Sequence, residues 1–142
     1  MNAHDPVNAY KEIQIKTANQ IRLIVMLYDG AIRHLNLAID AFGEGHHRYD
    51  VINNHLIAAQ DILSELMASL DFEKGGVLAK NLFSLYSFMN RRLLDGNLKK
   101  DPAPLAEVKK MLGDLREAWD EISTRKGLEE NTHPASGVNI AG

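Results

Sequence analysis

Cysteine is absent from this chain of 142 residues, so disulfides, thiolate metal sites and thiol nucleophiles are excluded. Long hydrophobic runs are absent as well. The longest run, Leu23 to Tyr28, is six residues, whereas a membrane-spanning helix needs about 20. The N-terminus also lacks a basic stretch followed by an apolar one, which is the pattern of a secretory signal. These absences favour a cytoplasmic protein without membrane insertion.

An excess of charge of one sign is also missing. The formal net charge is -3 and the sequence pI is near 6.0, which favours neither nucleic acid nor an anionic membrane as a partner. Basic pairs such as Arg91-Arg92 and Lys99-Lys100 are scattered and are typical of solvated helix faces. With 45% hydrophobic residues, the chain is expected to form one soluble domain with a genuine core.

What the sequence does contain is helical periodicity, in four long segments, and no segment alternates as a strand would. The expected helices cover residues 19–42, 49–70, 77–98 and 103–124. Asn19 and Asp101 are expected N-caps, Pro102 suits a first helical position, and Gly43 and Gly75-Gly76 interrupt the pattern. The expected core stripes are Ile24, Tyr28, Ala31, Leu35, Ala38 and Phe42; Ile52, Leu56, Ala59, Leu63, Leu66 and Leu70; Leu78, Leu82, Leu85 and Met89; and Leu105, Val108, Leu112, Leu115, Trp119 and Ile122.

Short connections between these segments force neighbouring helices to run in opposite directions. The sequence therefore predicts an all-α fold, an antiparallel up-down four-helix bundle over residues 19–124. Residues 1–18 contain Tyr10, Ile13 and Ile15 and are too apolar for a solvated tail, so we expect a capping segment that packs on the bundle. Residues 125–142 are rich in polar and small residues and contain Pro134, which predicts a flexible tail.

The first helix has a second apolar face, formed by Leu23, Met26, Gly30 and Leu37 and interrupted at Arg33. A helix that is apolar on two faces lies either at the centre of a larger core or beneath something that the chain does not contain. The third segment adds Phe83, Tyr86, Phe88 and Met89, and such aromatic and methionine side chains suit grooves that accept partner helices. Periodicity alone leaves both interpretations open.

Catalytic and metal-binding patterns are not convincing. Four-helix bundles can hold di-iron through Glu-x-x-His pairs on helices, but Glu44 to His47 lies in a glycine-flanked loop and Glu130 to His133 lies beside Pro134. Zinc needs converging ligands, and the adjacent His46 and His47, even with Asp50, His34 or His55, do not predict them. No phosphate-binding glycine loop or serine–histidine pair at short helical spacing is present. We expect no enzyme, no metal and no cofactor.

Several short motifs occur in a characteristic order along the chain. Tyr10 and Thr17-Ala18 precede Met26-Leu27-Tyr28-Asp29-Gly30, and they are followed by Ala59-Gln60-Asp61-Ile62-Leu63-Ser64-Glu65-Leu66, Gly75-Gly76, Asn81-Leu82, Leu85-Tyr86-Ser87-Phe88-Met89 and Leu115-Arg116-Glu117-Ala118-Trp119. Together they resemble the flagellar export chaperones of the FliS family, and the resemblance covers residues 9–124. One departure is Asn19-Gln20, where that family commonly has a Ser-Pro type of helix start.

The resemblance implies a cytosolic four-helix chaperone that binds the disordered C-terminal region of flagellin and prevents its polymerisation before type III export. We expect a monomer or weak dimer, with a flagellar regulatory protein or co-chaperone as a further candidate partner. The alternative is a four-helix adaptor or a self-associating structural protein whose apolar faces meet another copy.

In relatives the N-terminal segment can cover the groove for the client, meaning the bound flagellin segment. Carried over here, the resemblance makes Tyr10 and Ile13 the candidate cover, and a permanent packing contact is the alternative for Tyr10. The candidate partner-binding residues are Tyr10, Ile13, Leu23, Met26, Leu27, Tyr28, Gly30, Leu82, Leu85, Tyr86 and Met89.

Overall fold

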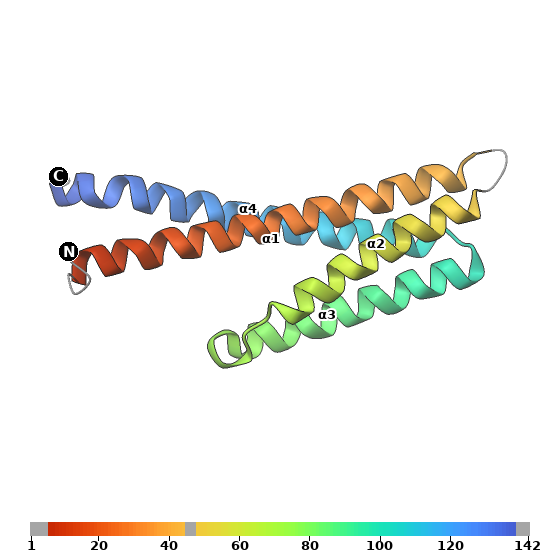
Figure 1. Ribbon diagram of the computed structural model, residues 1–142, viewed down its shortest axis with the longest axis horizontal. Coiled ribbons are helices and arrows are strands. Elements are labelled where there is room, and N and C mark those ends of the chain that lie inside the picture. Colours follow the sequence, from red (N-terminus) through yellow and green to blue (C-terminus); the bar gives the residue numbers. More distant parts are fainter. Residues whose placement is uncertain (1–5, 45–47, 139–142) are drawn as a thin grey trace. The chain divides into compact units, whose positions relative to one another are not determined.

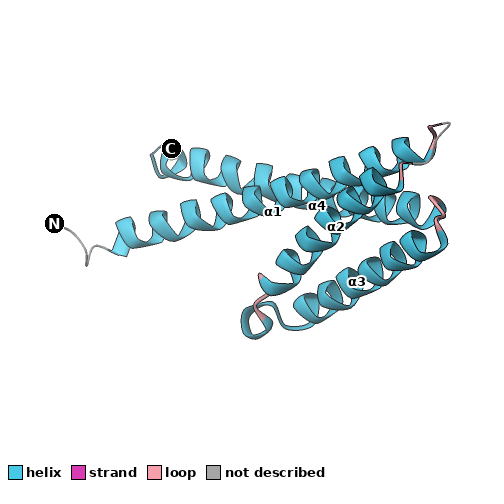
Figure 2. Cartoon of the chain, turned by 45° about the vertical axis from the view of Figure 1, so that its right-hand side comes forward, coloured by secondary structure: helices cyan, strands magenta, loops and turns pink. Residues whose placement is uncertain are grey.

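The computed structural model describes the backbone of residues 6–44 and 48–138, and the side chains of residues 7–8, 19–44 and 48–125. Its described residues form four helices, α1 (Pro6–Phe42), α2 (Tyr49–Ala68), α3 (Phe72–Lys99) and α4 (Ala103–Val138), and no strand (Figure 1, Figure 2). The predicted all-α class with four antiparallel helices is confirmed. Over the same described residues, no helix combines the length and the apolar composition that crossing a membrane requires.

The chain divides into two compact units. The four-helix unit comprises residues 27–115, which contain the C-terminal part of α1, all of α2 and α3, and the N-terminal part of α4. The terminal unit comprises residues 1–26 and 116–142, which contain the other parts of α1 and α4.

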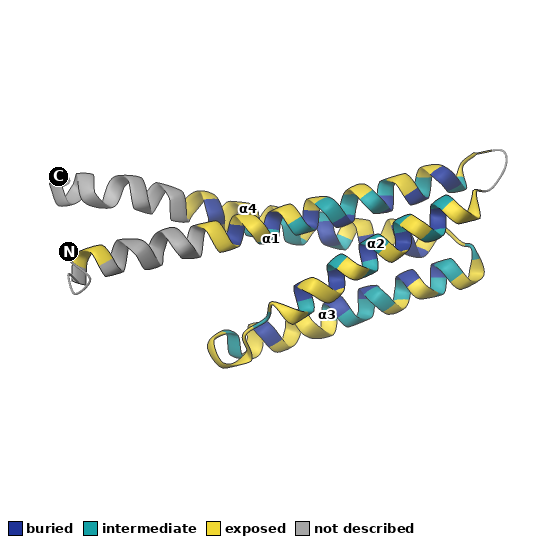
Figure 3. Ribbon diagram, viewed as in Figure 1, coloured by how far each residue is buried: buried dark blue, intermediate teal, exposed yellow. Residues whose placement is uncertain are grey.

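The core of the four-helix unit is built from one apolar stripe on each helix, coloured dark blue in Figure 3. Each stripe repeats at steps of three and four residues, the spacing that keeps side chains on one helix face. Burying a large apolar side chain contributes about 1.5–3 kcal/mol. The buried apolar residues are Tyr28, Ala31, Leu35, Ala38 and Ala41 of α1, Ile52, Leu56, Ala59, Leu63 and Leu66 of α2, Ala79, Leu82, Tyr86, Met89 and Leu93 of α3, and Leu105, Val108 and Leu112 of α4.

The stripe predicted for α3 is partly wrong. Leu78 is 58% exposed and Leu85 is only half-buried, whereas Ala79 and Tyr86 face the core. The observed stripe also includes Gly96, where a Cβ atom would lie 2.7 Å from Cδ1 of Leu105 on α4. At Gly96 the missing side chain lets α3 approach α4 closely, and a pattern built from large apolar residues misses this position.

Two predicted helix ends are also wrong. Helix α1 begins at Pro6 rather than at Asn19, and proline is favourable at a first helical position because its missing N–H has no partner there in any case. Helix α4 continues past Thr124 to Val138, so its end does not mark the start of a tail. The flexibility predicted for residues 125–142 stays a prediction, since the side chains after residue 125 and the backbone of residues 139–142 lie outside the described part of the chain.

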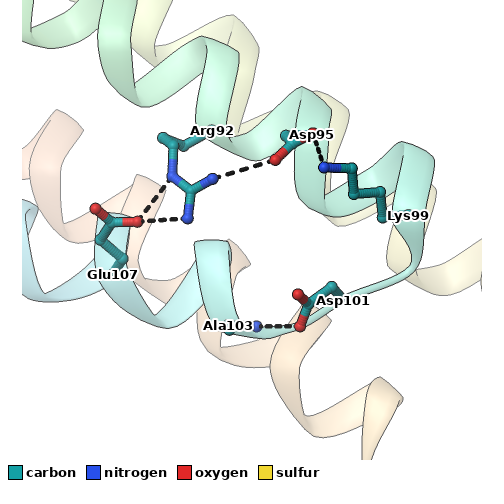
Figure 4. Close-up of polar contacts among 6 residues, drawn as sticks. All are labelled: Arg92, Asp95, Lys99, Asp101, Ala103 and Glu107. Carbon is teal, nitrogen blue, oxygen red and sulfur yellow. Dashed lines mark hydrogen bonds and ion pairs between the residues drawn. The ribbon is translucent and has the colours of Figure 1, made fainter.

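The other helix boundaries follow the expected chemistry. The backbone N–H of Ala103 donates to Oδ1 of Asp101 at 3.0 Å, so Asp101 caps α4 as predicted (Figure 4). Asp71 caps α3 by accepting from the N–H groups of Glu73 and Lys74, both at 3.0 Å. The expected interruption at Gly75-Gly76 is a kink inside α3, where Gly76 has φ 53° and ψ -125°.

Candidate partner-binding surface

In the terminal unit, α1 presents two large apolar side chains to solvent. Leu23 is 59% exposed and Met26 is 65% exposed, whereas Ile21 and Val25 on the same stretch are buried. The sequence left open which face of this helix points outward, and these four residues answer it for the terminal unit. Both exposed residues belong to the predicted partner-binding set, and their contact with a partner stays a prediction.

Four other members of the predicted set lie in the core of the four-helix unit. Tyr28, Leu82, Tyr86 and Met89 are buried, so in this arrangement they hold the helices together. Contact between these side chains and a partner would require the helices to separate, and it stays a prediction.

The remaining candidates divide into half-buried and undescribed side chains. Leu27, Gly30 and Leu85 are half-buried, and a Cβ atom on Gly30 would lie 3.3 Å from Cδ1 of Ile62, so α1 and α2 pack closely there. Tyr10 and Ile13 belong to α1, but their side chains lie outside the described part of the chain. The covering role predicted for Tyr10 and Ile13 therefore stays a prediction.

A tyrosine pair joins α1 to α3 inside the core. The hydroxyl oxygens of Tyr28 and Tyr86 are 2.5 Å apart, and the rings meet edge to face with centroids 6.3 Å apart. Each hydroxyl thereby meets the need of a buried polar group for a partner. Burial, and then the hydrogen bond with Tyr28, raises the pKa of Tyr86 far above its usual range, so this contact stays uncharged.

A histidine pair joins α1 to α2 in a less buried place. The Nδ1 atoms of His34 and His55 are 3.0 Å apart, and the ring centroids are 5.2 Å apart. Partial burial, and then the charge of Arg33 and the proximity of His55, lowers the pKa of His34. The sequence analysis considered His34 and His55 as additional zinc ligands beside His46 and His47. His46 and His47 lie outside the described residues. Within the described residues, no group of three or more histidine, aspartate and glutamate side chains could hold a metal ion.

Helices α2 and α3 also carry exposed apolar side chains, and the sequence analysis had named only Phe83 among them as suited to a groove for a partner helix. Phe72 and Phe83 make an edge-to-face ring contact with centroids 5.9 Å apart. Ile57 and Leu94 are 45% and 49% exposed. Each directly follows a core residue, Leu56 or Leu93, and therefore lies outside the core stripe of its helix. An apolar residue at such a position is the feature of the sequence that could have identified them. We refer to Ile57, Phe72, Phe83, Leu94 and Leu98 as the α2–α3 outer surface.

Helices α3 and α4 are joined by an ion-pair cluster rather than by apolar contacts alone (Figure 4). Nε and Nη2 of Arg92 each lie 2.8 Å from Oε1 of Glu107 on α4. Nη1 of Arg92 lies 3.1 Å from Asp95, which also pairs with Lys99 at 3.2 Å. This cluster fixes the turn between the two helices and brings together no catalytic set.

This chain is similar in sequence to one family of known proteins. The family model described as "Flagellar protein FliS" matches residues 3–126. The flagellar secretion chaperone FliS of Salmonella typhimurium is 36% identical over 132 residues, covering 88% of this chain and 95% of the relative. The protein of the same name from Bacillus subtilis is 33% identical over 140 residues, covering 97% of this chain and 99% of the relative. The flagellar secretion chaperone FliS of Escherichia coli is 33% identical over 125 residues, covering 85% of this chain and 91% of the relative.

Each of these matches covers at least 85% of this chain and at least 91% of the relative. The names describe chaperones and not enzymes, in keeping with a surface of exposed apolar side chains on a helical scaffold. The chain therefore belongs to the FliS family of flagellar secretion chaperones.

Proposed function

We propose that this protein binds the C-terminal region of flagellin in the cytoplasm and keeps it from polymerising until it is exported. The observation that carries the proposal is that Leu23 and Met26, two large apolar side chains of α1, are exposed to solvent. The chain also belongs to a family of secretion chaperones. Large apolar side chains that are kept in water on a folded scaffold mark a surface that another molecule covers.

The physical logic concerns the client as much as the chaperone. A segment that becomes helical only in a filament carries apolar stripes that would self-associate if they were left uncovered. An amphipathic helix places such a stripe into an apolar groove through residues spaced at three and four positions. Ordering the segment costs conformational entropy, so the covered apolar area must be large enough to offset that cost.

Tyr10 and Ile13 have a second role in the proposal. Both belong to the N-terminal part of α1, which is continuous with Leu23 and Met26 in this structure, and we propose that this part breaks away from the rest of α1 to cover the client-binding surface until flagellin displaces it. Replacing Tyr10 with aspartate is then expected to strengthen flagellin binding without unfolding the protein. Unchanged binding by this variant would leave Tyr10 as a permanent packing contact.

The test is a calorimetric titration of the purified protein with a peptide that covers the C-terminal region of flagellin. We expect saturable one-to-one binding with a negative heat-capacity change, the mark of apolar burial. The double variant Leu23→Glu and Met26→Glu should bind at least about tenfold more weakly, because two apolar contacts are lost and two charges are desolvated. The matched control is Gln20→Glu, which adds a charge to an exposed position of the same helix.

Light scattering with and without the peptide separates this proposal from a self-associating structural protein. A chaperone is expected to be a monomer or weak dimer that gains mass when flagellin is added. Absence of binding by a folded protein would overturn the proposal, and equal weakening by Gln20→Glu would remove Leu23 and Met26 from the binding surface.

A further inference from the structure

Met26 differs from the other methionines whose side chains the structure describes. It is 65% exposed on α1 of the terminal unit. Met89 is fully buried in the core of the four-helix unit, and Met67 and Met111 are half-buried. Among the described side chains, Met26 is therefore the one methionine that a small solute in water reaches freely.

Met67 has a further protection besides its partial burial. Oγ of Ser87 on α3 donates a hydrogen bond to Sδ of Met67 on α2, at 3.6 Å. This contact occupies one side of a weakly accepting sulfur and places a second helix beside it. The structure thus ranks the methionines by access to their sulfur, with Met26 first and Met89 last.

Access matters because the thioether of methionine reacts with peroxides. A sulfur lone pair attacks one oxygen of hydrogen peroxide, the O–O bond breaks, and the second oxygen leaves as water. Sulfur loses two electrons to the peroxide, and the product is methionine sulfoxide. Methionine sulfoxide reductases return the two electrons and restore the thioether, so the modification is reversible.

The position of Met26 on α1 gives this reaction a consequence for binding. Met26 and Leu23 are three residues apart, so the two exposed side chains share one helix face. In the free protein, a sulfoxide at residue 26 stays in water, where its added dipole costs the fold little. Beneath a bound apolar segment, the sulfoxide oxygen loses its hydrogen bonds to water, and that loss weakens the complex.

We propose that Met26 is a reversible oxidation site, and that its conversion to the sulfoxide by peroxide weakens the binding of the client. This inference rests on the proposed contact of flagellin with Leu23 and Met26. Leu23 has no oxidisable atom, so part of the apolar contact remains after oxidation. We therefore expect oxidation to weaken binding about three- to tenfold, less than the double variant Leu23→Glu and Met26→Glu does.

The first test measures the modification itself and needs no flagellin. The full chain is treated with hydrogen peroxide and digested with trypsin, which cleaves after Arg22 and Arg33 and so separates Met26 from every other methionine. Mass spectrometry should show Met26 reacting at least about tenfold faster than Met89. Protein oxidised at Met26 alone should melt within about 3 °C of untreated protein, because this side chain is not part of the core.

The second test is a calorimetric titration with the flagellin peptide before treatment, after removal of the peroxide, and after incubation with methionine sulfoxide reductases. Oxidation should weaken binding about three- to tenfold, and the reductases should restore it. Met26→Leu has no sulfur at this position, so its affinities before and after treatment should agree within about twofold, whatever the starting affinity. The matched control is Met111→Leu, which removes a methionine of α4 and should retain the full loss on oxidation.

The outcomes distinguish this proposal from the proposed function. Oxidation of Met26 without loss of binding would overturn the proposal and leave flagellin binding established. A loss of binding that persists in Met26→Leu would also overturn it, because another residue would then be responsible. Reaction of Met67 or Met89 before Met26 would refute the ranking by access. Absence of binding by the untreated protein would instead overturn the proposed function, while the oxidation rates would remain measurable.

Discussion

Two of the polar contacts that join α1 to its neighbours in the four-helix unit differ in how they respond to protons. The hydroxyls of Tyr28 and Tyr86 meet in the buried core between α1 and α3, where the raised pKa of Tyr86 keeps the contact neutral. The imidazoles of His34 and His55 meet between α1 and α2, where the lowered pKa of His34 favours a neutral ring. Both contacts bridge helices by one hydrogen bond, but only the histidine contact can change charge near neutral pH.

This difference shows that one helix can be held by a pH-independent contact on one side and a pH-dependent contact on another. A hydrogen bond between two Nδ1 atoms needs one donor and one acceptor, so it fails when both rings are protonated. Two imidazolium ions at that distance would also repel each other. Acidification is therefore expected to weaken the α1–α2 contact before it affects the α1–α3 contact.

The largest effect is expected at the tyrosine pair. Tyr86→Ala should lower the free energy of unfolding by about 3–5 kcal/mol, because it leaves a cavity and removes the partner of the Tyr28 hydroxyl. Tyr86→Phe should cost about 1–2 kcal/mol, because it removes only the hydrogen bond. Urea unfolding at neutral pH measures both values.

An exposed aromatic residue of the same helix provides the control for the tyrosine variants. Phe83 is not part of the core stripe, so Phe83→Ala should cost less than about 1 kcal/mol. A loss at Phe83 equal to that at Tyr86 would contradict the assignment of Tyr86 to the core.

A smaller effect is expected at the histidine pair, and it depends on pH. The pKa of His34 is below its usual 6.5 in the folded protein, so the unfolded state binds more protons as the pH falls. The free energy of unfolding should therefore be fully retained above about pH 6.5 and decrease below it. Solvent screens this half-buried group, so the change should stay below about 1 kcal/mol.

His34→Gln should reduce the slope of stability against pH between about pH 7 and pH 5, because the titrating member of the pair is removed. Tyr86→Phe should keep the original slope, since the tyrosine contact does not titrate in this range. Urea titrations at several pH values test both statements. An unchanged slope in His34→Gln would assign the pH dependence to other groups.

The smallest effect is expected at the ion pair between Arg92 of α3 and Glu107 of α4. This contact differs from the tyrosine and histidine contacts because it is formed by two charged groups. Glu107→Gln should cost about 0.5–1 kcal/mol, because Arg92 binds Glu107 through two nitrogen atoms and is half-buried. Asp114→Asn, which removes the exposed partner of Lys110, should cost less than about 0.3 kcal/mol. Thermal melts at low and high salt should show the difference shrinking as salt rises.

The sequence predicted those parts of the fold that depend on local periodicity. The stripe from Ile52 to Leu66 was predicted residue by residue, because a 3.6-residue repeat by itself determines which side chains share a face. The prediction failed where packing between helices determines which of two adjacent apolar residues is buried, as in the burial of Tyr86 rather than Leu85. It also missed the start of α1 at Pro6, because a favourable N-cap such as Asn19 does not prevent a helix from continuing.

The surface and the contacts between helices were harder to predict. The exposure of Leu23 and Met26 could be anticipated as one of two alternatives, because both apolar faces of the helix were visible in the sequence. The meeting of His34 with His55 depends on the register between helices. That register is set by side-chain packing across helices, and spacing along one helix contains no information on it.

Gly76 interrupts the start of α3 with a backbone conformation of the opposite hand to the helix around it. Its φ of 53° and ψ of -125° are the mirror image of an extended conformation that ordinary L-residues adopt readily. An L-alanine at this position is strained, whereas a D-alanine placed there by chemical synthesis would find its natural backbone conformation. Such a chain would also have fewer unfolded conformations than the glycine chain, so a single inverted stereocentre would stabilise the entry into α3.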